Sequence, residues 1–262
     1  MKNAENNISI PASVNIKIQE KSFWNSTVGP GELRKPYRSS WEQYHWEKIF
    51  ETVARNYDFR DRKILVAGCG TGIFEEWLAK RVRIREMVGM DLSERMIDLA
   101  RRRCNGIENV HFLVADLDAT PFPDRRFDVC VVIDALHHLP DEFRTLKELS
   151  RVSSDLVLSE PNALNPIRRL NERRFRKEMV TERSFYKSRI VGAIIGLGYD
   201  RVVVRNCHFI PSFMPTFLLS LLRRCELFLE RAPILKEFSG SLNIFAYRTF
   251  PNPNTIRFQR SE

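Results

Sequence analysis

The sequence predicts an α/β fold in which a seven-stranded, mostly parallel sheet carries helices on both faces. Between residues 63 and 160, short apolar runs alternate with longer amphipathic stretches, as in parallel strands joined by crossover helices. Of the 262 residues, 43% are hydrophobic and 29% are charged. That composition suits a sizeable core and excludes a disordered or collagen-like chain.

Residues 1–40 are expected to form an irregular N-terminal extension, because glycine and proline residues within positions 29–36 interrupt any regular element there. Aromatic residues of this N-terminal part could fold over the functional site as a lid, or they could simply pack on the sheet. These residues are Trp24, Tyr37, Trp41 and Tyr44.

The predicted body of the domain covers residues 41–262 and begins with a helix over 41–57. Five apolar runs then predict strands, and three amphipathic stretches predict helices. The strands are expected at residues 63–68, 86–91, 110–115, 127–134 and 155–160, and the helices at 73–83, 93–104 and 141–152.

The rest of the chain is less regular. A very basic helix is predicted over 163–177, and a second helix over 181–197 with Thr181 as its N-cap. Two further strands are expected at 201–206 and 242–247. Between them, residues of about 207–240 are expected to form an apolar helical insert.

The five cysteines include no CxxC pair and no cluster with zinc-ligand spacing. We therefore expect neither a disulfide framework nor a metal site, and a reducing cytoplasm is the simplest location. Residues 1–20 are polar and unlike a secretory signal. The longest uncharged stretch, 206–222, contains two prolines, so we expect no membrane span.

The most informative segment is the glycine-rich loop at residues 68–72, which follows a predicted strand and precedes a predicted helix. Glycines let a backbone turn sharply and come close to a ligand. The spacing is GxGxG, and Ile73 stands where a dinucleotide-binding loop has its last small residue. The loop thus argues against a pyrophosphate cofactor, and a plain strand–helix turn is the alternative for the loop taken alone.

Two carboxylates follow neighbouring strands of the predicted sheet. Asp91 ends the second strand, where an acid can accept hydrogen bonds from both hydroxyls of a ribose, and Asp116 follows the third, where an acid can accept from an adenine amino group. Each alone could be a helix cap or part of a turn. Together with the glycine loop, they lie at the one edge where open parallel sheets bind ligands.

With the segments 116–124, 127–130 and 135–139, these features resemble the class I S-adenosylmethionine-dependent methyltransferases, which share a Rossmann-like fold. The resemblance covers roughly residues 63–160. It implies S-adenosylmethionine as cofactor, held by the glycine loop, by the two acids and by the residues beside them. Carried over to this sequence, the cofactor-binding residues are Gly68, Cys69, Gly70, Gly72, Asp91, Leu92, Asp116 and Leu117.

Val66 departs from the family pattern. The family often has an acidic residue two positions before the first glycine, and that acid helps to anchor the amino-acid end of the cofactor. Asp134, at the end of the fourth predicted strand, could partly compensate. We therefore include Asp134 among the expected cofactor-binding residues.

Two residues are candidate catalytic groups. Methyl transfer from a sulfonium depends mainly on proximity and orientation, and a base is needed only where the acceptor loses a proton. His138 follows the fourth strand, and an imidazole titrates near neutral pH. Glu160 ends the fifth strand and could position or deprotonate an acceptor hydroxyl. The competing interpretations are that the histidine packs the next helix and that Glu160 bonds to a helix N-terminus.

Lysine and arginine number 42 against 33 acidic residues, which gives a net charge of +9. Residues 168–177 concentrate six of these cations beside the expected acceptor site, and the apolar insert carries Arg223 and Arg224. The basic stretch could bind a phosphate-bearing acceptor, or it could rest with the insert on an anionic membrane. An ordinary buried lid helix is the competing interpretation of the insert.

These observations predict an enzyme that methylates an oxygen atom of a small molecule, such as a sugar or a lipid-linked acceptor. The alternatives are C-methylation of a quinone precursor, RNA methylation, and a non-catalytic protein that binds the cofactor for interaction. RNA is disfavoured because the sequence shows no appended binding module and no Asn-Pro-Pro-Tyr-type motif after the fourth strand.

Overall fold

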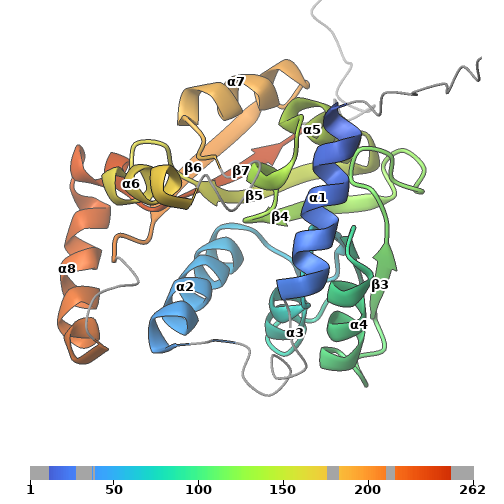
Figure 1. Ribbon diagram of the computed structural model, residues 1–262, viewed down its shortest axis with the longest axis horizontal. Helices are drawn as coiled ribbons and strands as arrows, with labels where there is room; N and C mark the ends of the chain where they lie inside the picture. The colour runs from blue at the N-terminus through green and yellow to red at the C-terminus, as the bar shows by residue number, and fades with distance from the viewer. Residues whose placement is uncertain (1–11, 28–36, 38, 176–182, 211–215, 249–262) are drawn as a thin grey trace, which may run out of the picture.

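The computed structural model describes residues 12–27, 37, 39–175, 183–210 and 216–248 (Figure 1). Its sheet has seven strands in the order β3-β2-β1-β4-β5-β7-β6. The strands are β1 (Lys63–Ala67), β2 (Glu86–Asp91), β3 (Val110–Val114), β4 (Phe127–Ile133), β5 (Ser153–Pro161), β6 (Arg201–Cys207) and β7 (Ser241–Tyr247).

Strands β1 to β5 run parallel to one another, and β7 pairs antiparallel with both β5 and β6. The predicted Rossmann-like, mostly parallel sheet is therefore confirmed. The helices are α1 (Ala12–Thr27), α2 (Ser40–Asn56), α3 (Ile73–Ala79), α4 (Glu94–Arg103), α5 (Glu142–Val152), α6 (Pro166–Phe175), α7 (Lys187–Gly196) and α8 (Leu219–Arg231).

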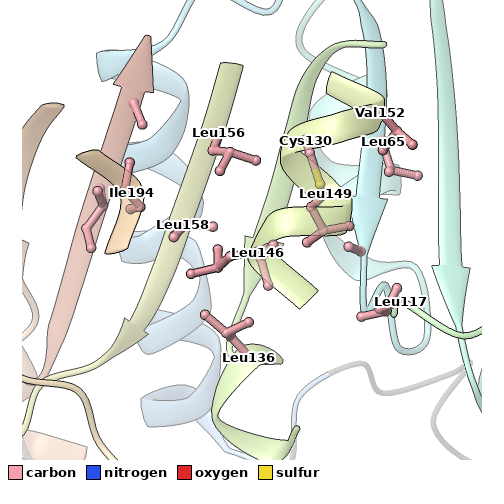
Figure 2. Close-up of a cluster of buried hydrophobic side chains, with 14 of the residues drawn as sticks. Leu65, Leu117, Cys130, Leu136, Leu146, Leu149, Val152, Leu156, Leu158 and Ile194 are labelled. Atoms are coloured by element: carbon pink, nitrogen blue, oxygen red, sulfur yellow. The ribbon is translucent and has the colours of Figure 1, made fainter. Parts of the chain in front are cut away.

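Alternating side chains of the strands build a core on each face of the sheet, because successive residues of a strand point to opposite sides. Leu65 packs with leucines of α5 and isoleucines of α7 in one cluster (Figure 2). Its neighbours Ile64 and Val66 pack with residues of α2, α3 and α4 in the other. Both faces of the sheet are thus covered by helices, as the sequence pattern predicts.

Two expectations about local structure are wrong. The N-terminal extension is not irregular throughout, because residues 12–27 form α1. The helix predicted over 181–197 begins only at Lys187, because Phe185 instead forms a β-bridge with Asn162. The proposed cap Thr181 lies outside the described residues. Within the described part of the chain, no helix is both long enough and apolar enough to span a bilayer.

Candidate active site

The glycine loop joins β1 to α3 and uses left-handed backbone angles at its glycines. Gly68 has φ +73°, and a side chain there would lie only 2.4 Å from the Cβ of Ala135. Gly70 has φ +52°, and a side chain there would point into open space. The open space in front of Gly70 leaves room for a ligand to approach the backbone closely. Gly72 faces Ala100 instead, so its role is packing of the loop against α4.

This open space is part of a cavity of about 440 Å³ at the carboxyl edge of the sheet, which we call the cofactor cavity. Asp91 stabilises the loop, because its carboxylate accepts hydrogen bonds from the backbone N–H of Gly70 at 3.0 Å and of Ser93 at 2.9 Å. Burial raises the pKa of Asp91. The predicted residues that line the cavity are Gly68, Cys69, Gly70, Asp91, Leu92, Asp116, Leu117, Asp134 and His138.

Helix α1 forms one wall of the cofactor cavity, which the sequence pattern did not indicate. The ammonium of Lys17 lies 2.7 Å from both carboxylate oxygens of Asp116 and 2.6 Å from Asp118. Trp24 of the same helix contacts His138 edge-to-face, with ring centroids 5.3 Å apart. The interpretation of Trp24 as part of a lid therefore agrees with its position, whereas Trp41 is buried in a separate cluster.

The arrangement around the missing acid fits a cofactor with a positively charged end. Val66 lines the cavity as an apolar residue. Asp134 lines it as well, and its Oδ1 is buried without a hydrogen-bond partner among the described residues. Asp134 adopts φ +48° directly after β4, a conformation that aspartate tolerates better than most residues. An orphaned carboxylate oxygen at this place suits the amino-acid ammonium or the sulfonium of S-adenosylmethionine.

A second cavity of about 480 Å³, which we call the acceptor cavity, lies beside the first. The two cavities share Glu42, Trp46 and Asp134 as lining residues. The walls of the acceptor cavity combine apolar side chains with cationic or titratable ones. Its further lining residues include Trp41, His45, Arg168, His208, Phe209 and Ile210.

Two histidines and Asp134 meet where the cavities join. Nε2 of His45 lies 3.8 Å from Oδ2 of Asp134, and the rings of His45 and His208 have centroids 4.3 Å apart. Burial tends to raise the pKa of Asp134, but the neighbouring His45 and His137 outweigh it and hold that pKa below its usual value. Burial keeps the pKa of His208 well below its usual value. The junction therefore contains the carboxylate of Asp134 and the neutral imidazole of His208.

The two sequence candidates for catalysis occupy different positions. Burial, helped by the charge of His137, lowers the pKa of His138 to about 2, so its imidazole stays neutral. Glu160 is fully buried and lines neither cavity. Its carboxylate accepts from the backbone N–H of Leu136 at 2.8 Å and contacts Nδ1 of His137 at 2.8 Å. This geometry ties Glu160 to the turn after β4.

Asp134, His137 and Glu160 also place three potential metal ligands within 4.8 Å of one another. The hydrogen bonds just described account for the buried carboxylate of Glu160, and Glu160 in turn raises the pKa of His137 against the opposing effect of burial. Hydrogen bonding therefore accounts for Glu160 and His137, whereas Oδ1 of Asp134 has no hydrogen-bond partner among the described residues.

The basic stretch 168–177 is described only in part. Arg168 lines the acceptor cavity. The side chains at 173–175 and all of residues 176–177 lie outside the described part of the chain. The side chain of Arg103, at the end of α4, is 4% exposed and donates to the carbonyl of Thr71 at 2.8 Å, which supports the glycine loop.

Comparison with known proteins agrees with this geometry. Residues 64–155 match the model of a methyltransferase domain family. A fatty-acid O-methyltransferase of Mycolicibacterium smegmatis is 31% identical over 40% of this chain and 38% of its own. A demethylmenaquinone methyltransferase of Staphylococcus saprophyticus is 35% identical over 34% of this chain and 39% of its own. The chain thus spans about two fifths of the length of these curated relatives.

The fold is shared more widely than the sequence. Magnesium protoporphyrin IX methyltransferase from Synechocystis, solved with bound S-adenosylmethionine, superposes with a TM-score of 0.61 at 17% identity. The match covers 92% of this chain and all of that one, at 100%. At this identity the comparison shows a common fold.

Proposed function

We propose that this chain, which belongs to the class I S-adenosylmethionine-dependent methyltransferases, methylates an oxygen atom of a small sugar or lipid-linked molecule held in the acceptor cavity. One observation carries the proposal: the acceptor cavity and the cofactor cavity share Glu42, Trp46 and Asp134. Ligands in the two cavities would meet at that boundary. Proximity and orientation of this kind supply much of the rate enhancement of a displacement reaction.

In this proposal, different residues of the cofactor cavity bind different parts of the cofactor. S-adenosylmethionine supplies an activated methyl group on a sulfonium. Asp91 accepts from the ribose hydroxyls, Asp116 accepts from the adenine amino group, and Gly70 allows close approach of the backbone. Asp134 faces the positive charge with its unpartnered Oδ1, and so takes over part of the role of the acid that Val66 replaces.

Three side chains are candidates for the base that receives a proton from an acceptor hydroxyl. His45 has the most suitable position, because it lines the acceptor cavity and its Nε2 lies 3.8 Å from Oδ2 of Asp134, at the junction of the two cavities. His138 lies in the cofactor cavity, and its low pKa makes it a weak base. Glu160 is enclosed by its own hydrogen bonds. We therefore assign the base to His45.

The apolar walls of the acceptor cavity favour an acceptor with a lipid portion. Trp41, Phe209 and Ile210 line it, and small-molecule sites are typically apolar with a few polar groups. The similar fatty-acid O-methyltransferase is named for an acceptor of this class. Similarity to a demethylmenaquinone methyltransferase favours C-methylation of a quinone precursor as the second candidate.

The test is transfer of a tritiated methyl group from S-adenosylmethionine to the lipid and aqueous fractions of a cell extract, with mass spectrometry of the labelled product. We expect a single lipid or sugar product with a new O-methyl group. His45→Asn should lower the transfer rate about 100-fold and leave cofactor binding intact, whereas His138→Asn should lower it less. A C-methylated quinone precursor would support the second candidate, and an RNA product or no product would refute both.

A further inference from the structure

We propose that the outer surface of α8 and the turn after it docks the protein on an anionic lipid bilayer. The segment runs from Phe217 to Phe238 and is called the α8 face below. Helix α8 lies at the periphery of the molecule (Figure 1), where one side of it remains uncovered by other described elements. This inference stands apart from the proposed function, because it concerns where the protein binds and not what it methylates.

The uncovered side of α8 carries large apolar side chains that are exposed to solvent. Phe217 is 83% exposed, Leu221 is 60% exposed and Phe228 is 70% exposed. Their spacing of four and seven residues places them along one side of a helical path. Exposed apolar residues gathered in one place mark interaction sites more often than scattered ones do. The turn adds the exposed residues Ile234, Leu235 and Phe238.

Positive charge accompanies these apolar residues. Arg224 lies three residues after Leu221 and four before Phe228, so it belongs to the same side of the helix. Arg223 and Arg231 are also exposed, and the guanidinium of Arg223 lies over the ring of Tyr44 at 4.1 Å. Arginine beside aromatic and aliphatic residues is the composition of helices that lie in a membrane interface.

Each acidic side chain of the same segment is paired with another residue of the protein. Glu226 is fully buried, where it accepts from the hydroxyl of Tyr44 and from the backbone N–H of Phe209 at 2.5 Å. Glu230 pairs with Lys48 at 2.8 Å, and Glu237 pairs with Lys187 at 2.5 Å. The surface that remains is apolar and cationic, and an anionic lipid surface complements both properties.

A second copy of the chain fits this surface less well. A twofold-symmetric contact places the same patch on both partners, so Arg224 and Arg231 of each copy would face those of the other. The chain as a whole also carries a net charge of +9. The negative headgroups of an anionic bilayer would instead attract these arginines. We therefore propose a bilayer as the partner of the α8 face.

The position of α8 relates this docking surface to the acceptor cavity. Glu226 holds the backbone of Phe209, and Phe209 lines the acceptor cavity. Leu222, on the inner side of α8, packs against the cluster that contains Trp41, another lining residue. A bilayer on the outer side of α8 would lie one helix thickness from the place where a lipid-linked acceptor would bind.

Flotation of the full chain with vesicles tests the proposal. Vesicles of phosphatidylcholine with 30% phosphatidylglycerol should retain the protein at low salt, and pure phosphatidylcholine should retain about tenfold less. Leu221→Ser with Phe228→Ser should abolish retention, and Arg224→Glu should weaken it about tenfold. Ile195→Ser is the matched control, because Ile195 is 56% exposed on α7 and should have no effect. Circular dichroism verifies that each variant is folded.

Three outcomes would overturn the inference. The first is no binding to anionic vesicles at low salt. The second is binding that Ile195→Ser weakens as much as the α8 variants do, because retention would then be nonspecific. The third is a stable dimer in analytical ultracentrifugation that Leu221→Ser with Phe228→Ser dissociates, because the α8 face would then be covered by a second copy.

Discussion

Glu75 of α3 has the environment that most clearly favours a neutral carboxyl group. It is fully buried near the glycine loop, and neither of its oxygens has a hydrogen-bond partner among the described residues. Burial raises its pKa from 4.5 to about 8, with a smaller contribution from the charge of Asp91. The folded protein therefore keeps Glu75 protonated at neutral pH, whereas the unfolded chain ionises it.

The free energy of unfolding should depend on pH through Glu75. The pKa of Glu75 is higher in the folded protein than in the unfolded chain. The contribution of Glu75 to the free energy of unfolding is therefore fully present below pH 4.5 and is lost as pH rises to about 8. At about 1.4 kcal/mol for each pKa unit, the loss is on the order of 5 kcal/mol. Glu75→Gln removes the ionisable group, so its stability should fall less over this range in urea unfolding experiments.

The matched control is Glu51→Gln, which changes an exposed glutamate paired with Arg55 on the surface of α2. It should keep the pH profile of the wild type. Parallel profiles for Glu75→Gln and the wild type between pH 5 and pH 8 would show that Glu75 is already ionised in the folded protein.

The place of a residue in the site could be predicted from sequence where it depends on the strand that the residue follows. It could not be predicted where it depends on contacts between distant parts of the chain. Asp91 and Asp116 were predictable because each follows a strand of a parallel sheet, and the ends of such strands converge on one edge. His45 and His208 were not, because one belongs to α2 and the other follows β6. Only the tertiary fold brings their ring centroids to 4.3 Å from each other, and no spacing in the sequence predicts that contact.

Among the elements, the parallel part of the sheet was the most predictable and α1 the least. Strands β1 to β5 lie within one residue or two of their predicted bounds, because buried parallel strands are continuous apolar runs. Helix α1 has polar residues throughout, so periodicity does not reveal it. Its contacts include polar ones to the cavity rim, such as Lys21 with Glu94 and Asn25 with Ser93, and the packing of Trp24 on α4.

The position of α1 leads to a prediction about cofactor affinity. Lys17 pairs with Asp116, the acid assigned to the adenine amino group, so lysine and cofactor compete for one carboxylate. Lys17→Met removes the competing charge and should tighten S-adenosylmethionine binding about fivefold in calorimetry, the equivalent of an ion pair worth about 1 kcal/mol.

Lys21→Met is the matched control, because Lys21 lies one turn along α1, lines the same cavity and pairs with Glu94 instead. It should change the affinity little. Weaker cofactor binding in Lys17→Met would show that Lys17 helps to hold the cofactor and does not compete with it.

For the whole molecule, the net charge of +9 has no part in the predicted contacts with a cationic cofactor, which are made by carboxylates. Several arginines serve internal purposes, as Arg103 does at the glycine loop and Arg151 does in its contacts with Glu148 and Asp124. The α8 face is where exposed arginines lie among exposed apolar residues. If the α8 face docks on anionic lipid as proposed, its exposed arginines account for part of this charge excess.

S-adenosylmethionine is expected to bind in the cofactor cavity beside the glycine loop, and calorimetry of the full chain measures this binding directly. The wild type should bind with measurable heat, and Asp91→Ala should bind at least tenfold more weakly, because it loses hydrogen bonds to a charged group. Asp98→Ala, an exposed aspartate of α4, should bind like the wild type. No binding by the folded wild type, or equal binding by Asp91→Ala, would show that this cavity does not hold the cofactor as proposed.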